Sequence, residues 1–205
     1  TSKARPTFVA SAGKLSGSTG STSFSINVPS GVQNGDMLIA VVSAAAAGGV
    51  GSWTQASFTW ALRETNRNPN LGVAYRIANN EPGSYTFTLG NTGTGGGHIF
   101  AYRGAGWDTI GAIATTSNSA SLAANSITIS QSNAILLGAW AINEASETFG
   151  TPSGMAQVVS GVSTSNPNWI VYSQNVGSGS TGTKTATLSP NNGNSSAVLF
   201  SIIPA

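Results

Sequence analysis

An internal repeat constrains the fold of this chain more than any other feature of its sequence. Asn68-Pro69-Asn70 recurs as Asn166-Pro167-Asn168, and each copy precedes a strand-like run that begins at Leu71 or Trp169. Residues 83–89 match residues 182–188 at a shift of 99. Because these matches keep their order along the chain, we infer two copies of one unit, at residues 22–105 and 122–205.

Further matches align the remaining elements of the two copies. Residues 36–40 match residues 133–137 at a shift of 97, and Ile99-Phe100 matches Val198-Leu199 at a shift of 99. Ile26 and Val28 match Ile127 and Ile129 at a shift of 101. A longer connection at residues 29–35 of the first copy accounts for this variation.

Strand signals dominate both copies. Short runs rich in Val, Ile, Thr and aromatic residues alternate with Gly, Asn, Ser and Pro clusters, which is typical of antiparallel sheets. No window shows the spacing of an amphipathic helix over more than two turns. We expect strands at residues 7–11, 23–28, 37–43, 58–64, 71–77, 85–89, 98–103, 109–114, 126–130, 134–142, 157–162, 169–176, 183–188 and 197–203.

The predicted fold is all-β. Two five-strand copies that cannot each cover an apolar face are expected to pack as one antiparallel, jelly-roll-like β-sandwich of about ten strands. Two tandem five-strand sandwiches are the alternative. Because no Pro-rich or charged linker separates the copies, we expect one domain at residues 22–205, preceded by an N-terminal arm at residues 1–21 with an edge strand.

Composition excludes several classes of function. The chain has 14 charged side chains in 205 residues, no Cys and one His, so thiol, disulfide and zinc chemistry are not expected. The net charge of +2 comes from scattered basic residues, which does not favour nucleic-acid binding. No apolar run approaches the roughly 18 residues of a membrane-spanning helix. We therefore expect no cofactor, no metal, no nucleic acid and no membrane.

Few side chains are candidates for catalysis. Glu144 and Glu147 lie three residues apart in a predicted loop, a placement that rarely spans a glycosidase cleft. His98 follows three glycines at the predicted start of a strand, with no nucleophile motif beside it. We expect the protein not to be an enzyme.

Two tryptophans and two groups of basic residues are candidates for binding. Trp53 and Trp107 fall in predicted loops, where each could cover the end of the core, anchor a subunit interface or stack on a glycan. The candidate polar contacts to a partner are, in the arm, Lys3, Arg5 and Lys14, and, in the first copy, Arg63, Arg67 and Arg76. A surface with so little charge suits a subunit of an assembly.

The first copy resembles the β-sandwich structural proteins of tailed bacteriophage virions. The resemblance rests on four segments: residues 28–40 (VPSGVQNGDMLIA), 74–78 (AYRIA), 82–87 (PGSYTF) and 100–104 (FAYRG). The second copy departs from it, with Ser201-Ile202 where the first copy has Tyr102-Arg103. The resemblance implies a head decoration or cement protein, or a component of a tail or fibre, and no catalytic residues.

From this resemblance we expect a structural virion protein, most of all a capsid decoration subunit. Its partners would be other virion proteins, the major capsid protein among them, and it would form a homo-oligomer, with a trimer favoured. It would lie on the virion surface after assembly in the host cytoplasm. The alternative is a carbohydrate-binding adhesin or receptor-binding tail component that uses the loop tryptophans.

Overall fold

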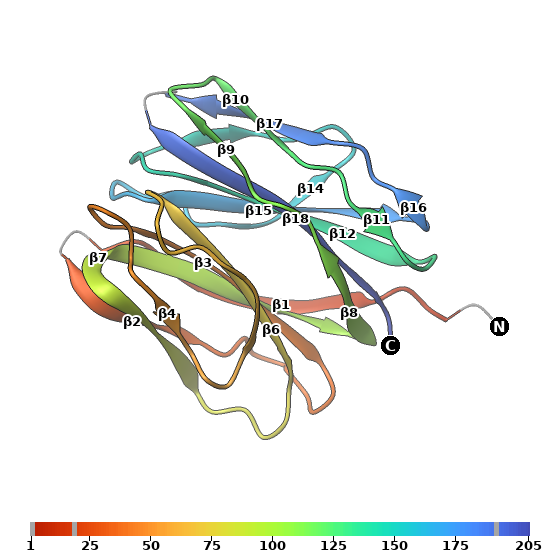
Figure 1. Cartoon of the computed structure of the whole chain (residues 1–205). Coiled ribbons are helices and arrows are strands. Elements are labelled where there is room, and N and C mark those ends of the chain that lie inside the picture. Colours follow the sequence, from red (N-terminus) through yellow and green to blue (C-terminus); the bar gives the residue numbers. More distant parts are fainter. Residues whose placement is uncertain (1–2, 18–19, 191–192) are drawn as a thin grey trace.

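The prediction of an all-β protein is confirmed. A computed structural model describes residues 3–17, 20–190 and 193–205, and these residues form antiparallel strands and no helix (Figure 1). Two parts of the predicted arm, at residues 1–2 and 18–19, lie outside the described residues. The strands are β1 Thr7–Lys14, β2 Ser21–Asn27, β3 Met37–Ala45, β4 Trp53–Thr54, β5 Thr59–Arg63, β6 Asn70–Ile77, β7 Ser84–Arg103, β8 Ala105–Ile110, β9 Ala114–Ser117, β10 Ser121–Ala124, β11 Thr128–Ile129, β12 Ala134–Ile142, β13 Thr148–Gly150, β14 Ala156–Ser160, β15 Asn168–Val176, β16 Gly179–Ser180, β17 Lys184–Ser189 and β18 Asn194–Pro204.

Each copy contributes one large sheet and a smaller layer that covers it. The large sheets have the orders β1-β7-β3-β6-β5 and β8-β18-β12-β15-β14, so they correspond strand for strand. In the first copy, β2 and β4 pair with the first half of β7. In the second copy, the sheets β10-β17-β13 and β11-β16 occupy the corresponding place.

The molecule has three apolar cores in place of the single core that the sequence favours. One core lies inside each copy, between its large sheet and its smaller layer. A third lies between the two large sheets, which pack face to face in the middle of the molecule (Figure 1). The central strands β3 and β12 are buried along their whole length. Because both faces of each strand are apolar, each face packs against another layer. The copies are therefore two sandwiches, as in the tandem alternative, joined by a shared core.

The strand register corrects the alignment of the copies. Ser43 pairs with Leu71 and Gly96, while Ala141 pairs with Trp169 and Ser196. These pairs align β3 with β12 at a shift of 98 and β7 with β18 at a shift of 100, so the expected shifts of 97 and 99 are each wrong by one residue. Such a slip would exchange the two faces of a strand.

β7 is one continuous strand where the sequence predicts two strands and a glycine-rich connection. It leaves the small layer after its first half and enters the large sheet beside β3. Gly97 permits this close approach, because a Cβ there would lie 2.6 Å from the Val41 carbonyl oxygen. Gly104, at φ +67°, then turns the chain from β7 of the first copy to β8 of the second.

The N-terminal arm contributes β1, an edge strand that is longer than the predicted residues 7–11. It pairs with β7 from Thr7 to Lys14. Its counterpart in the second copy is β8, which pairs with β18. The structural repeat therefore runs from β1 to β7 and from β8 to β18.

Candidate binding site at the junction of the two copies

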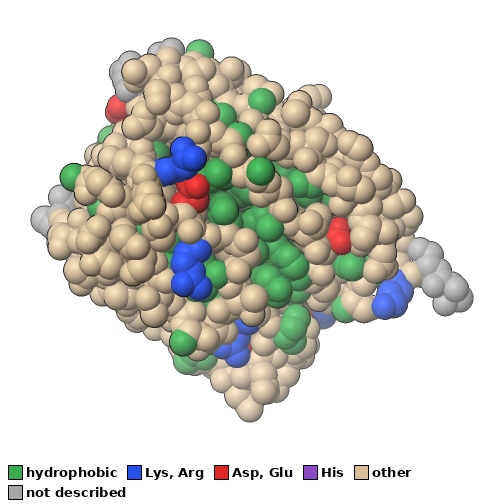
Figure 2. Space-filling model, in the orientation of Figure 1, with side chains coloured by type: hydrophobic (Ala, Val, Ile, Leu, Met, Phe, Trp, Pro, Cys, Tyr) green, Lys and Arg blue, Asp and Glu red, His purple; other side chains and the backbone are tan. Residues whose placement is uncertain are grey.

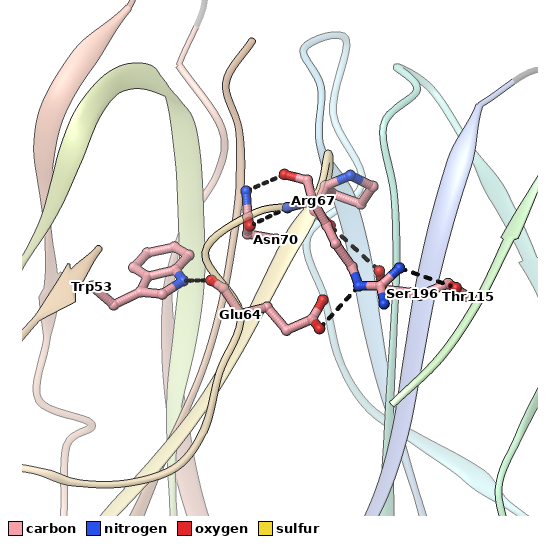
Figure 3. Close-up of polar contacts among 7 residues, drawn as sticks. Trp53, Glu64, Arg67, Asn70, Thr115 and Ser196 are labelled. Atoms are coloured by element: carbon pink, nitrogen blue, oxygen red, sulfur yellow. Dashed lines mark hydrogen bonds and ion pairs between the residues drawn. The ribbon is translucent and has the colours of Figure 1, made fainter. Parts of the chain in front are cut away.

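A polar pocket of about 440 Å³ lies where the turn before β6 meets β9 and the start of β18. The pocket thus takes residues from both copies, which approach each other across the central core (Figure 3). Its lining consists of Asn66, Arg67, Asn68, Pro69, Thr115, Thr116, Ser117, Asn194, Ser195 and Ser196.

The Asn-Pro-Asn motif shapes the turn that forms one wall of the pocket. The Asn68–Pro69 peptide bond is cis. The side chain of Asn70 closes the turn, because its Oδ1 accepts a hydrogen bond from the Arg67 backbone amide at 3.0 Å and its Nδ2 donates to the Arg67 carbonyl. Figure 3 shows the side chain of Arg67 extending from this turn toward Glu64 and toward Thr115 of the second copy.

Arg67 links the two copies at the pocket. Its Nε donates to Glu64 Oε1 at 3.1 Å, and its Nη1 donates to Thr115 Oγ1 of the second copy at 3.3 Å. Burial raises the pKa of the Glu64 carboxyl, and the neighbouring Arg67 guanidinium opposes that shift. The pair leaves this part of the pocket with little net charge.

Three oxygen atoms at the pocket differ in their hydrogen bonding. The Pro69 carbonyl accepts a hydrogen bond from Ser196 Oγ at 3.3 Å. Ser195 is only 2% exposed, and its Oγ forms no hydrogen bond within the described residues. The buried Asn68 Oδ1 likewise has no hydrogen-bond partner among those residues. Both atoms belong to residues that line the pocket, but they are buried behind its surface and unpaired within the described part of the protein.

The equivalent junction on the other side of the molecule is filled. Asn168 closes the second turn by donating from Nδ2 to the Ser165 carbonyl at 2.8 Å, and the Pro167 carbonyl accepts from Ser16 Oγ at 2.7 Å. The Trp169 indole N–H donates to His98 Nδ1 at 3.1 Å across the central core. Burial lowers the pKa of His98 to about 4, so the ring is neutral at physiological pH and can accept this bond.

The six basic residues singled out in the sequence do not form one cluster. Figure 2 shows several basic side chains beside a band of apolar ones on one face of the molecule. Arg63 lies over the Trp60 ring, Arg67 lines the pocket, and Arg76 pairs with Glu81 at 2.9 Å. In the arm, the carbonyl of Lys3 accepts from Asn133 Nδ2 at 2.9 Å, Arg5 is half-buried and Lys14 is exposed at the end of β1.

The two candidate tryptophans lie in strands, so their placement in loops is wrong. Trp53, on β4, is 1% exposed and donates its indole N–H to the Glu64 carbonyl at 2.7 Å. Trp107, on β8, stacks on Tyr75 with ring centroids 4.3 Å apart. Trp53 therefore presents no ring face to a ligand, and Tyr75 covers one face of Trp107.

The carboxylates do not assemble into a catalytic or metal-binding arrangement. No three His, Cys, Asp or Glu side chains in the described ranges lie close enough together to hold a metal ion. Glu147 is buried, and this burial raises its pKa to about 7. Asp36 is held in a bidentate pair by Arg103, with both distances 2.9 Å, and the hydrogen bonds from Arg103 lower its pKa. Across the described residues, no helix is long and apolar enough to cross a membrane.

Of the residues that line the pocket, the sequence singles out only Arg67 as a candidate for binding, and Asn68 and Pro69 only as part of the repeated motif. The others are Ser, Thr, Asn and Pro from three separate segments, and no motif connects them. The signal that would have found them is the repeat itself, because Ser195 and Ser196 stand where the first copy has Gly95 and Gly96 in the corrected register. Comparison with known proteins adds nothing to this site: no protein family, curated protein or solved structure matches the chain.

Proposed function

We propose that the protein is a non-enzymatic structural subunit of a bacteriophage virion, most of all a capsid decoration subunit that acts through protein–protein contacts. The observation that carries this proposal is a set of three exposed apolar side chains on or just beyond the outer strands β1 and β14, here called the apolar strip. Phe8 is 43% exposed, Leu15 47% and Val162 37%. Phe8 also lines a shallow groove with Tyr102 and Val158, from the two copies.

The same edge has backbone groups that can pair with another chain. Among the described strands, β1 pairs only with β7, and β14 pairs only with β15, so each is the outer strand of its large sheet. Outer strands are common sites for adding a strand from a partner. Apolar side chains beside free strand edges therefore suit a contact with the major capsid protein or with another copy in a homo-oligomer, such as a trimer.

The resemblance of the first copy to virion β-sandwich proteins supports the same proposal. Such a subunit would stabilise the folded shell by mass action, because it binds the assembled capsid and not the disassembled one. It would lie on the virion surface. The two sandwiches have three apolar cores and little charge. These properties suit a structural subunit that acts only by binding.

Co-sedimentation with emptied virion shells tests the proposal. Phe8→Lys places a charge in the apolar strip and is expected to reduce binding by at least tenfold, equivalent to about 1.4 kcal/mol. Ile77→Lys is the matched control, because Ile77 is 50% exposed but lies at the end of β6, away from this edge. Equal binding by Phe8→Lys and the unchanged protein, or no binding by either, would contradict the proposal.

The contribution of the basic arm needs a short deletion. Removing residues 1–20 would also remove β1 and leave β7 without its partner, so lost binding could reflect lost folding. Deleting residues 1–5 keeps β1 intact and removes Lys3 and Arg5. Reduced binding to shells by this variant would assign a role to the arm, and unchanged binding would exclude one.

A further inference from the structure

A groove of about 250 Å³, here called the edge groove, lies where β1 and β7 of the first copy meet β14 and β15 of the second. Its lining consists of Phe8, Tyr102, Gln157, Val158 and Ser173. Phe8 and Gln157 are exposed, and Val158 and Ser173 are half-buried, so a ligand can reach these walls. The volume is below the range of about 300–1,000 Å³ that is usual for whole small-molecule ligands, and it suits a single side chain.

The opposite edge of the molecule shows what the repeat places at the same position. Strand pairing puts Trp107 at the position of Phe8 and Tyr75 at the position of Ser173. Tyr75 of the first copy lies flat on Trp107 of the second, with ring centroids 4.3 Å apart and an angle of 4° between the rings. A serine has no ring with which to cover Phe8 in this way. The edge groove therefore lacks the aromatic ring that covers the corresponding residue at the opposite edge.

Tyr102 covers Phe8 only in part. The two rings meet edge to face, with centroids 5.6 Å apart and an angle of 76° between them. The Tyr102 side chain is buried and its hydroxyl forms a hydrogen bond with Ser173, so Tyr102 joins the two copies beneath the groove. Aromatic rings pack well against one another in edge-to-face and offset-stacked pairs. A further ring in the groove would thus meet two aromatic side chains and Val158.

Both outer strands are irregular beside the groove. The pairing of β1 with β7 shifts register between Phe8 and Ala10, and the pairing of β14 with β15 shifts between Gln157 and Val159. Such bulges interrupt the regular row of backbone groups to which another strand would pair. At this point of the edge, a side chain of the partner and not its backbone is expected to make the contact.

The charged residues along this edge are basic. Arg5 precedes β1, Lys14 ends it, and Arg103 ends the neighbouring strand β7. The Asp36 side chain is only 3% exposed and is already paired with Arg103. Residues 151–176, which include β14 and β15, have no charged side chain. A partner segment with acidic residues therefore complements this edge.

A second copy of this chain does not meet these requirements. Among the strongly exposed large apolar side chains of the described ranges, Phe8 is the one aromatic residue. Its neighbours in the sequence are Thr7 and Val9, and the charged residues at the two ends of its strand are basic. Two such edges would repel each other. The fitting partner is therefore a different protein.

From these observations we propose that the edge groove binds an aromatic side chain of a different protein, on a segment with acidic residues on both sides of the ring. The inference deepens the proposed function and rests on it for the partner's place in the virion. Aromatic residues that fill a pocket near the centre of an interface commonly supply much of its binding energy. Phe8 and Tyr102 contact the ring, and the basic residues of the edge attract the flanking carboxylates.

Two-dimensional amide NMR on the full chain tests the inference with three capped peptides, Asp-Tyr-Asp, Asp-Leu-Asp and Lys-Tyr-Lys. Asp-Tyr-Asp is expected to shift amide signals of β1 and β14, with a dissociation constant in the millimolar range. The other two are expected to bind at least about tenfold more weakly, because one lacks the ring and the other has the opposite charge. Absence of shifts with Asp-Tyr-Asp, or equal binding by either of the other peptides, would overturn the inference.

Two variants place the binding in the groove. Phe8→Ala removes an exposed wall and is expected to weaken Asp-Tyr-Asp binding by about tenfold. The matched control is Ile77→Ala, because Ile77 is also exposed but lies at the end of β6, outside the groove. Ser173→Tyr introduces the tyrosine of the opposite edge and is expected to abolish binding by filling the groove. If Ser173→Tyr does not fold, as judged by its thermal transition, Phe8→Ala alone decides the location, and unchanged binding by Phe8→Ala would overturn the inference.

Competition at emptied virion shells separates this inference from the proposed function. Asp-Tyr-Asp at about ten times its dissociation constant is expected to weaken shell binding by about tenfold, by mass action. Shell binding that this excess leaves unchanged would keep the virion role and overturn the groove as its contact. Peptide binding by a protein that does not bind shells would support the groove and contradict the virion role.

Discussion

The two junctions between the copies share the same turn and the same Asn-Pro-Asn motif. The first junction opens onto a pocket, whereas the second is filled by a side chain. In the first junction, the turn opens onto a polar pocket and is surrounded by Leu71, Ser196 and Glu64. The corresponding residues of the second are Trp169, Gly96 and Gly161, and here the indole fills the space. A Cβ at Gly96 would lie 2.6 Å from Trp169, and one at Gly161 would lie 2.0 Å from it. One large side chain and the two glycines that make room for it therefore distinguish a filled junction from an open one.

The largest expected effect comes from giving the second junction the residue of the first. Trp169→Leu replaces the indole with a smaller aliphatic side chain, and so removes the hydrogen bond to His98 and part of the packing in the central core. We expect the free energy of unfolding, measured with urea, to fall by about 3 kcal/mol, the lower end of the usual cost of truncating a buried Trp to Ala, because Leu keeps part of the buried side chain.

Leu71, the counterpart of Trp169 in the first junction, provides the control for this loss of stability. Leu71→Val removes one methylene from the first junction and is expected to cost about 1 kcal/mol. Similar losses in Trp169→Leu and Leu71→Val would contradict the view that the indole is what fills the second junction.

The next effect concerns the carboxyl group beside each turn. Burial is the largest influence on the pKa of both carboxyl groups, but the Arg67 guanidinium opposes it at Glu64, whereas at Glu147 it raises the pKa from 4.5 to about 7. Between these two values the folded protein binds more protons than the unfolded chain, so its stability falls as pH rises through this window. Glu147→Gln should remove the part of that fall that comes from Glu147 and stabilise the protein above pH 7 by about 1–2 kcal/mol.

Urea unfolding at several pH values from about 4 to 8 measures this difference between the carboxyl groups. Glu144→Gln serves as the control, because Glu144 makes only a minor contribution to the shift at Glu147. A pH slope that is unchanged in Glu147→Gln would assign the dependence to another group.

The smallest expected effect compares the two hydroxyl groups that bind the proline carbonyls. Ser16 Oγ lies 2.7 Å from the Pro167 oxygen, and Ser196 Oγ lies 3.3 Å from the Pro69 oxygen. Ser16→Ala should cost about 1 kcal/mol, and Ser196→Ala should cost less, because its bond is longer and lies at the open junction. Thermal unfolding of both variants measures the order, and the reverse order would contradict the description of the first junction as the more open one.

The sequence predicts the strands and the repeat well, but not the exact register. Residues 37–42 and 134–137 are apolar on both faces, so a shift by one residue leaves the pattern unchanged and only the pairing of Ser43 and Ala141 settles it. These strands are apolar on both faces, and each apolar face must pack against another layer. This pattern could have indicated three cores. Gly51 and Ser52 indicate a loop at Trp53, yet the pairing of Trp53 with β7 buries it.

The pocket could not be predicted from any single segment. Its walls come from residues 66–69, 115–117 and 194–196, which the fold brings together across the junction of the copies. Each segment alone has the composition of an ordinary turn or an exposed strand end. Only the difference between Ser195-Ser196 and Gly95-Gly96 in aligned copies carries information about the site.

The NMR titration of His98 tests the contrast between the junctions most directly, because this residue is the one histidine of the chain. If Trp169 fills the second junction and buries the imidazole against the central core, His98 should titrate with a pKa of about 4. The Trp169→Leu variant should move that pKa upward. A pKa near the ordinary value of 6.5 in the unchanged protein would mean that the ring is solvated and that the second junction is not filled.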